Sequence, residues 1–191
     1  MKYYAIKDEN HKILVDNWDE AKEIIKECNN PSYKSFSIKE EAEAFLNDLE
    51  YSDNIDEPKA YIDGSYNEKL DIYGFGVILI IDGNIYRYKK NFNDEYKDTR
   101  NVAGEIKAAA YIINHSYKNG IKKLHIFFDY QGIESWYIGA WKANSKLAQK
   151  YQEFAKEMEG KIEVIFHKVK SHTNNKYNDL ADKLAKEAVN L

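Results

Sequence analysis

YGFGVILIIDGNIYRYKKNF, residues 73–92, contains two runs of β-forming residues on either side of Asp82-Gly83-Asn84. Because a short turn of this composition between two such runs is typical of antiparallel hairpins, the segment predicts two neighbouring strands. Its longest apolar run, Phe75 to Ile81, is far shorter than the roughly 20 residues that span a bilayer. The hairpin therefore predicts part of the sheet of a soluble protein, and no membrane partner is expected.

The sequence around this hairpin alternates between strand and helix patterns. A strand at Ala60–Asp63 precedes it, and a helix with apolar residues at helical spacing follows at Asn101–Tyr117. The later predicted elements are a strand at 124–128, a helical stretch after Gln131, a helix at 145–158, a strand at 162–166 and a helix from Lys176 onward. The order β-β-β-α-β-α-α-β-α predicts an α/β fold with a mixed sheet and helices on its faces.

The first 48 residues form a separate pattern of short strands and helices. We expect strands at 3–7, 13–15 and 33–36, a helix at 18–27 that Asp16 or Asn17 caps, and a helix at 39–49. The stretch that follows is acidic, aperiodic and ends at Pro58, which is typical of interdomain linkers. The predicted organisation is a small α/β domain at 1–49, a linker at 50–58 and a larger domain at 59–191.

Charge and cysteine content limit the function classes. The 191 residues carry a net charge of −4, and residues 1–50 hold seven lysines against twelve acids, so global electrostatics do not favour a nucleic-acid ligand. Cys28 is the single cysteine, which excludes an intrachain disulfide. The N-terminus has no apolar core of the kind that an export signal needs. A reducing, cytoplasmic setting is expected.

Three acids occupy positions that packing does not explain. Asp63 and Asp129 each follow a predicted buried strand, and Glu105 interrupts the apolar face of a helix. Two adjacent strands that end in aspartate would place two carboxylates side by side, where a divalent cation relieves their repulsion. Each acid also has an ordinary interpretation: Asp63 starts a turn with Gly64, Glu105 is an exposed first-turn acid that the helix dipole favours, and Asp129 caps the next helix. Together they indicate a two-metal nuclease site.

This order of elements and acids resembles the ribonuclease H family over the whole second domain. The resemblance implies a ribonuclease H-like mixed five-stranded sheet flanked by helices, and endonucleolytic hydrolysis of the RNA strand of RNA–DNA hybrids that leaves 5′-phosphate and 3′-hydroxyl ends. It also implies two Mg²⁺ ions per site, with Mn²⁺ as an alternative. The residues that carry the resemblance are YIDGS at 61–65, NVAGE at 101–105, FDYQGI at 128–133, VKSH at 169–172 and NDLADKLA at 178–185.

The resemblance assigns roles to individual residues. The metal-binding carboxylates are implied to be Asp63, Glu105, Asp129 and Asp182, and His172 is implied to be a mobile histidine that assists water activation or product release. Asp179 lies three residues before Asp182 on the same helix, so spacing alone does not choose between them. The family register favours Asp182. The residues implied to contact the substrate are Gly64, Ser65, Asn101 and Gln131.

The N-terminal domain is similar to the hybrid-binding domain found ahead of many type-one ribonucleases H and in caulimovirus viroplasmin. The similarity rests on YYAI at 3–6, NWDEAK at 17–22, YKSF at 33–36 and EAEAFL at 41–46. It implies that Tyr4, Trp18, Tyr33 and Lys34 belong to the hybrid-binding surface, with stacking at Trp18 and Tyr33 and a phosphate contact at Lys34. The alternative is a spacer or protein-binding module in which Trp18 and Tyr33 are core aromatics.

Two other functions remain open at this point. A non-catalytic nucleic-acid or protein-binding module on the same fold would be expected to have lost at least one of the four acids, and all four are present. A related nuclease that acts on DNA alone is disfavoured by Asn101 and Gln131, which are polar groups suited to a ribose hydroxyl. The expected partner is an RNA–DNA hybrid, and no obligate protein partner is evident.

Overall fold

The computed structural model describes residues 2–46, 56–169 and 175–190, with only the backbone of Glu40. The chain divides into two compact units, residues 1–56 and 57–191. Most of the linker expected at 50–58 lies outside the described residues, so its bounds stay a prediction. Within the described ranges, the helices are too short or too polar to cross a membrane.

The second unit is built on a mixed five-stranded sheet. Its strands run in the order β6-β5-β4-β7-β8, with β4, β5 and β6 antiparallel and β7 and β8 parallel to β4. The hairpin read from residues 73–92 is present as β5 and β6. The predicted α/β fold with a mixed sheet is therefore confirmed. The strands are β4 (Lys59–Asn67), β5 (Ile72–Ile81), β6 (Asn84–Phe92), β7 (Lys123–Phe128) and β8 (Glu163–Lys168).

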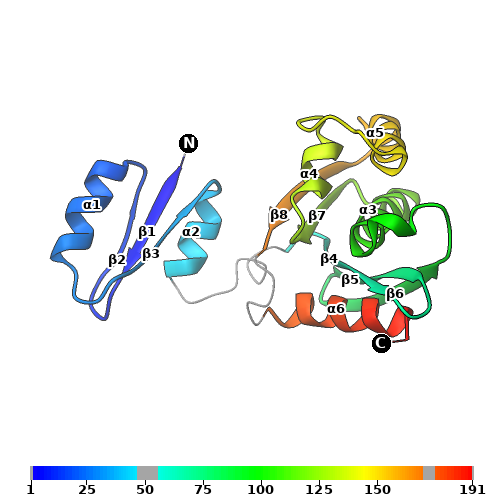
Figure 1. The fold of residues 1–191 in the computed structure, drawn as a ribbon. Coiled ribbons are helices and arrows are strands. Elements are labelled where there is room, and N and C mark those ends of the chain that lie inside the picture. The colour runs from blue at the N-terminus through cyan, green and yellow to red at the C-terminus, as the bar shows by residue number, and fades with distance from the viewer. Residues whose placement is uncertain (1, 47–55, 170–174, 191) are drawn as a thin grey trace. The chain divides into compact units, whose positions relative to one another are not determined.

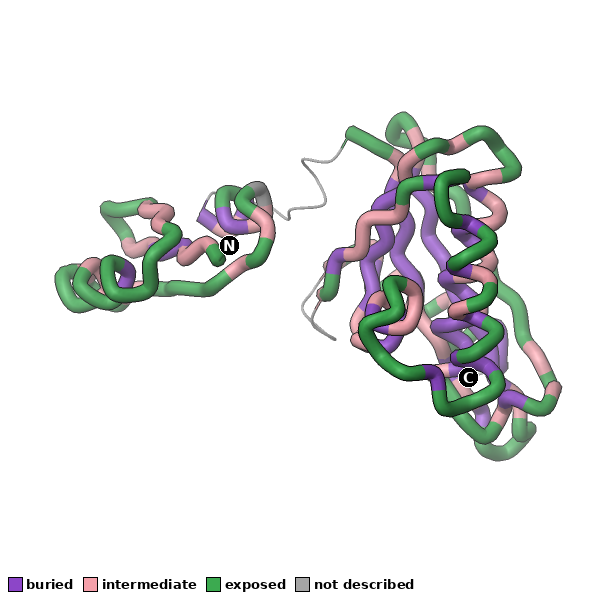
Figure 2. The backbone as a smooth tube through the Cα atoms, turned by 90° about the horizontal axis from the view of Figure 1, so that it is seen from above, coloured by how far each residue is buried: buried purple, intermediate pink, exposed green. Residues whose placement is uncertain are grey.

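Helices cover both faces of this sheet (Figure 1). The helix α6 packs on β4 and β5, and α3 packs on the same strands from the other side, where α5 lies against α3. The main hydrophobic core lies between the sheet and α3 and α5, and Figure 2 shows the buried residues concentrated in the strands. The helical elements are η2 (Lys97–Thr99), α3 (Asn101–Lys118), α4 (Gly132–Tyr137), α5 (Lys146–Met158) and α6 (Lys176–Ala188).

The strand β4 continues past the point where the sequence predicts its end. It pairs with β5 along its full length, so Asp63 lies opposite Gly76 in the middle of the strand and does not start a turn. Its parallel pairing with β7 stops at Tyr61, which lies opposite Phe127. Asp63 therefore stands where β4 and β7 cease to pair. The long antiparallel ladder outweighs the local turn preference of the Asp-Gly-Ser sequence.

Two glycines in the sheet allow helices to approach its backbone closely. A Cβ atom on Gly64 would lie 2.2 Å from the carbonyl oxygen of Asn101, and one on Gly76 would lie 2.1 Å from that of Ala181. Side chains at these positions would push α3 and α6 away from the sheet, because atoms cannot approach so closely. Both helices carry acids of the predicted site.

The first unit is a three-stranded antiparallel sheet with two helices. The strand β1 is central, and β2 and β3 pair with its two edges. Asn17 caps the first helix, where its side chain accepts hydrogen bonds from two backbone N–H groups, as the sequence predicts. The buried core of this first unit is small, and Figure 2 shows mostly exposed and half-buried residues in it. The elements are β1 (Tyr3–Lys7), β2 (Lys12–Val15), α1 (Trp18–Glu27), β3 (Ser32–Phe36) and α2 (Lys39–Leu46).

Candidate active site

Three of the predicted acids converge at the end of the β4–β7 pair. Asp63 comes from β4, Asp129 directly follows β7, and Glu105 projects from the first turns of α3. One carboxylate oxygen from each lies within 4.8 Å of the others. The parallel register of Tyr61 with Phe127 brings the two aspartates together, because each comes two residues later in its chain. The close approach of α3 to β4 at Gly64 brings Glu105 beside the two aspartates.

Burial and the neighbouring negative charges favour the neutral forms of Glu105 and Asp63 when no cation is bound. Glu105 is only 2% exposed, and its Oε2 has no hydrogen-bond partner among the described residues. Burial, then the charges of Asp129 and Asp63, raises the pKa of Glu105 to about 9. Burial, then the charge of Asp129, raises the pKa of Asp63 to about 7. A cluster of carboxylates with raised pKa values is typical of a functional site.

Asp182 lies close enough to act electrostatically on the cluster but is not one of its three members. Its negative charge contributes to the raised pKa of Asp63, and its Oδ2 accepts a hydrogen bond of 2.7 Å from Lys186 on the same helix. Asp179 is exposed, whereas Asp182 is half-buried. The metal-binding role of Asp182 stays a prediction.

The arrangement fits a hard divalent cation. The donors are carboxylate oxygens, which Mg²⁺ and Mn²⁺ prefer, and the Oε2 atom of Glu105 is buried with no hydrogen-bond partner in the described part of the chain. Removing the proton from a buried acid is costly unless a positive charge replaces it. The residues that could hold a cation are therefore Asp63, Glu105 and Asp129, with Asp182 beside them.

The other predicted site residues surround this cluster in part. Gly64 and Ser65 follow Asp63 in β4, and the backbone N–H of Gly64 donates a 2.7 Å hydrogen bond to Oδ1 of Asp63. Asn101 is exposed at the start of α3. The side-chain amide of Gln131 donates to Glu134 at 3.0 Å and to Ser135 at 3.2 Å, so internal bonds hold it. His172 lies outside the described residues, and its role stays a prediction.

Two buried histidines to which the sequence assigns no role form a chain of hydrogen bonds that ends at the exposed Glu57. His125 Nδ1 lies 2.8 Å from His167 Nε2, and His125 Nε2 lies 2.7 Å from a carboxylate oxygen of Glu57. The two rings stack at an interplanar angle of 6°. Burial lowers the pKa of His125 despite the neighbouring acid. These contacts link β7, β8 and the residues before β4. The sequence signal that could have revealed them is the position of each histidine inside an apolar strand.

Sequence reasoning also missed Lys186 and Gly76, which shape the surroundings of Asp182. Lys186 follows Asp182 by four residues, which is the spacing of a helical ion pair. Glycines inside an apolar strand, as at Gly76, signal a close approach of another backbone. Both signals are present in the sequence, although neither identifies the partner element.

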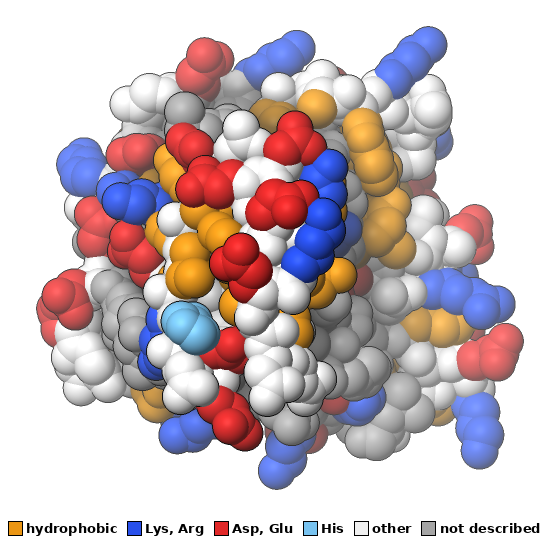
Figure 3. All heavy atoms as spheres, turned by 90° about the vertical axis from the view of Figure 1, so that its left-hand side faces the viewer, with side chains coloured by type: hydrophobic (Ala, Val, Ile, Leu, Met, Phe, Trp, Pro, Cys, Tyr) orange, Lys and Arg blue, Asp and Glu red, His pale blue; other side chains and the backbone are white. Residues whose placement is uncertain are grey.

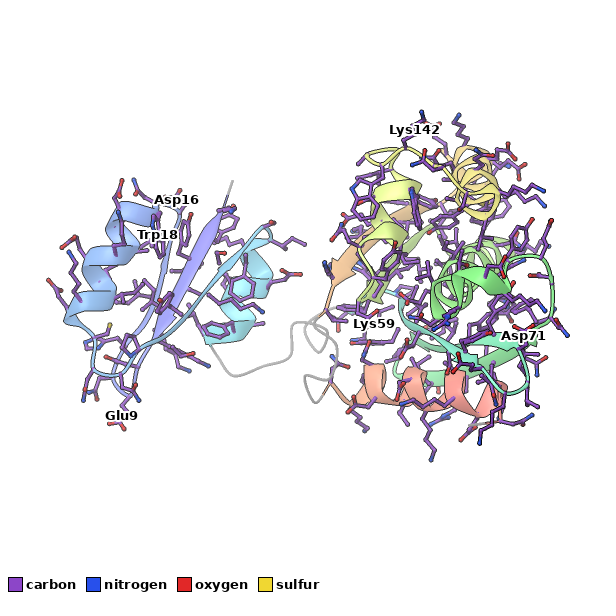
Figure 4. All side chains as sticks on the ribbon, viewed as in Figure 1. Glu9, Asp16, Trp18, Lys59, Asp71 and Lys142 are labelled. Atoms are coloured by element: carbon purple, nitrogen blue, oxygen red, sulfur yellow. The ribbon has the colours of Figure 1, made fainter. Side chains whose placement is uncertain are left out.

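The aromatic residues predicted to bind a hybrid line a groove in the first unit. The groove has a volume of about 400 Å³ and includes all four predicted residues, Tyr4, Trp18, Tyr33 and Lys34. The rings of Tyr4 and Trp18 lie 5.1 Å apart between centroids. Trp18 is 43% exposed and Tyr33 is 53% exposed, so neither is a core aromatic. Figure 4 shows Trp18 beside Asp16 at one end of the unit.

The surface charge around this groove is mixed. Figure 3 looks on to the α1 side of the first unit and shows acidic side chains interspersed with lysines on that face. Acids and lysines pair along α1, at 2.6 Å between Asp19 and Lys22 and at 2.7 Å between Glu23 and Lys26. Such exposed pairs contribute little stability, and they leave few uncompensated positive charges on the helix.

Comparison with known proteins gives two family matches. The model of the RNase H family matches residues 57–190, and the model described as the ribonuclease H1 N-terminal domain matches residues 2–46. A ribonuclease H of Francisella philomiragia is 28% identical over 147 residues and covers 68% of this chain and 89% of its own length. A ribonuclease H of Wolbachia pipientis is 25% identical over 136 residues and covers 68% and 92%.

Solved structures share the fold of the second unit. RNase H1 from Halobacterium salinarum superposes with a TM-score of 0.58 at 22% identity, covering 70% of this chain and 98% of that one. LC11-RNase H1, whose structure was determined in complex with an RNA/DNA hybrid, superposes with a TM-score of 0.55 at 14% identity, covering 70% and 99%. With the family match over more than half of its length, the chain belongs to the RNase H family and carries an N-terminal unit of the ribonuclease H1 type.

Proposed function

We propose that this protein hydrolyses the RNA strand of RNA–DNA hybrids with the help of two divalent cations, leaving 5′-phosphate and 3′-hydroxyl ends. The observation that carries the proposal is the convergence of Asp63, Glu105 and Asp129, with Asp182 near them, in a chain of the RNase H family. The relatives named ribonuclease H support it, although their identity to this chain is about a quarter.

The residues of the site have distinct tasks in this proposal. When bound, the cations lower the pKa of a water molecule and stabilise the leaving oxygen. Glu105 and Asp63 must lose the protons that their raised pKa values favour, so they accept cations most readily above neutral pH. Lys186 offsets the negative charge of Asp182 at a distance of 2.7 Å before a cation is bound. Asp129, directly after β7, supplies the third carboxylate of the cluster.

Recognition of RNA requires donors and acceptors near the reacting phosphate, because the 2′-hydroxyl is the local feature that separates RNA from DNA. Asn101, exposed at the start of α3, is placed four residues before Glu105 and is available for this contact. Gln131 would have to exchange its bonds to Glu134 and Ser135 for a bond to the substrate. The complex of LC11-RNase H1 with an RNA/DNA hybrid supports a hybrid as the substrate class.

The first unit is proposed to hold the hybrid, with 1–49 as the domain and 50–58 as its linker. Exposed aromatic rings such as Trp18 and Tyr33 offer flat surfaces on which sugars and bases can stack, and Lys34 in the same groove offers a positive charge for a phosphate. The twelve acids against seven lysines in residues 1–50 oppose a purely electrostatic interaction. Stacking is therefore expected to supply most of the affinity.

A cleavage assay on three labelled duplexes tests the proposal. With Mg²⁺, the purified chain is expected to cut an RNA–DNA hybrid and to leave duplex DNA and duplex RNA intact. Asp129→Asn should abolish cutting without abolishing hybrid binding, whereas Asp179→Asn, an exposed acid of α6, serves as the control and should keep its activity. Equal cleavage of duplex DNA would reject the substrate, and an active Asp129→Asn variant would reject the site.

A further inference from the structure

A second group of metal-ligating side chains lies in the first unit. Asp8 and His11 belong to the turn between β1 and β2, and Cys28 is the C-terminal cap of α1. One ligand atom from each lies within 4.8 Å of the others. Figure 4 marks this turn with Glu9, at the opposite end of the unit from Trp18. None of the three residues lines the aromatic groove, so the cluster is separate from the proposed hybrid-binding surface.

The backbone fixes the carboxylate at the centre of this cluster. The Asp8 side chain is only 2% exposed, and its Oδ1 accepts hydrogen bonds from the backbone N–H groups of Asn10 at 2.9 Å and His11 at 2.7 Å. Its Oδ2 accepts a third, of 3.1 Å, from the N–H of Asn29, which follows Cys28. The carboxylate therefore ties the hairpin turn to the end of α1. Backbone donors of this kind commonly orient metal-binding carboxylates.

The separation of His11 and Asp8 suits a small ion. His11 Nδ1 lies 2.9 Å from Asp8 Oδ1, which is the length of an ordinary hydrogen bond. Ligand bonds of about 2.0–2.1 Å in tetrahedral geometry separate two such donors by about 3.3 Å. An ion would thus replace the hydrogen between these two atoms after they move apart by only a few tenths of an ångström. The thiol of Cys28 would lose its proton to solvent on binding.

The donor set also selects the kind of ion. A sulfur, an imidazole nitrogen and a carboxylate oxygen together favour borderline-soft divalent ions, above all Zn²⁺, over Mg²⁺. The carboxylates at Asp63, Glu105 and Asp129 offer oxygen alone and favour the opposite choice. The chain therefore presents two clusters with contrasting preferences.

We propose that Asp8, His11 and Cys28 form a binding site for a zinc-class transition-metal ion in the first unit. With three protein ligands, a tetrahedral ion keeps a fourth position for water or an external donor, and the His11 side chain is 56% exposed, so solvent reaches that side. The ion clamps the β1–β2 turn to the end of α1. It also adds positive charge to a region with an excess of acids.

Cobalt spectroscopy on the full-length protein tests this site directly. Co²⁺ bound by a thiolate gives a charge-transfer absorption in the near ultraviolet, and Cys28 is the only thiol of the chain, so the band has a single possible source within it. In a buffer that contains Mg²⁺, titration with Co²⁺ is expected to produce the band, to saturate at one ion per chain, and to lose the band when Zn²⁺ is added.

Three variants separate this site from the catalytic acids. Cys28→Ser should remove the band, and His11→Ala should weaken Co²⁺ binding at least about tenfold while the circular dichroism spectrum stays unchanged. Asp63→Asn, in the other cluster, should leave both the band and its affinity intact. The proposal is overturned by the absence of a band at millimolar Co²⁺, by saturation at half an ion per chain, or by an unchanged affinity in His11→Ala.

Discussion

Replacing Asp63 with asparagine is expected to stabilise the metal-free protein above neutral pH, although it removes a proposed cation ligand. Burial and the charge of Asp129 make the ionised form of Asp63 unfavourable in the folded state. An amide of the same shape carries no charge, so the repulsion disappears. The proposed active site is therefore a place where the metal-free fold gives up stability.

The magnitude follows from the pKa of Asp63, which burial and then the charge of Asp129 raise from 3.8 to about 7. A raised pKa means that the folded state binds this proton more tightly than the unfolded chain does. The stability that this tighter proton binding contributes is fully present below pH 3.8 and is lost as the pH rises through about 7. About three pH units, at about 1.4 kcal/mol each, set an upper limit of about 4 kcal/mol on the gain at pH 8.

Urea unfolding in the presence of a chelator measures this gain. Of the three tryptophans, Trp18 lies in the first unit, whereas Trp136 and Trp141 lie in the second. A Trp18→Phe background therefore makes fluorescence report the second unit alone. At pH 4 the free energy of unfolding should be similar for the wild-type protein and the Asp63→Asn variant. At pH 8 the variant should be more stable by about 1–4 kcal/mol.

A matched control and the addition of Mg²⁺ make this test decisive. Asp179→Asn removes an exposed acid from α6 and should change stability by less than about 0.5 kcal/mol at either pH. Mg²⁺ should reduce the advantage of the Asp63 variant, because the wild-type site binds the cation and the variant binds it weakly. A gain that is the same at pH 4 and pH 8, or a loss at pH 8, would refute the repulsion argument.

Other perturbations test the remaining parts of the structure. Gly76→Ala should destabilise the second unit by about 1–3 kcal/mol in urea unfolding and should lower cleavage, because its Cβ would lie 2.1 Å from a carbonyl oxygen of α6. Glu105→Gln should weaken Mg²⁺ binding at least about tenfold in calorimetry while the fold stays intact, since the wild-type carboxyl, with a pKa of about 9, is neutral at pH 7 without a cation. Trp18→Ala should raise the dissociation constant for a hybrid about tenfold at high salt, with Trp141→Ala, an exposed tryptophan of the second unit, as the unchanged control.

The sequence predicts the elements of this protein well because local signals mark them. The hairpin at 73–92 has a turn sequence between two β-forming runs, and Asn17 has the side chain that a helix N-terminus needs. Acids after apolar strands also point to a shared edge of the sheet, where Asp63 and Asp129 do lie together. These signals act over a few residues, so they are visible without the fold.

The remaining features depend on contacts between distant segments. The full-length pairing of β4 with β5 carries the strand through Asp63, against the turn preference of the local sequence. The depth of Glu105 depends on how closely α3 approaches β4, and the electrostatic effect of Asp182 on Asp63 depends on which face of α6 turns toward the sheet. His125 and His167 meet because β7 and β8 are parallel neighbours. Periodicity alone does not fix these relationships.

The close contacts at Gly64 and Gly76 couple the helices of the proposed catalytic pocket to the sheet, so the pocket does not move independently of it. Each acid on a helix keeps its place through backbone-to-backbone contact with the sheet, so a separation the size of one methyl group would pull Glu105 or Asp182 away from Asp63. Cation affinity should therefore respond to remote destabilisation of the second unit, with ion release and loosening of its helices occurring together. A titration with Mg²⁺ would then report how closely the helices of this unit pack against its sheet.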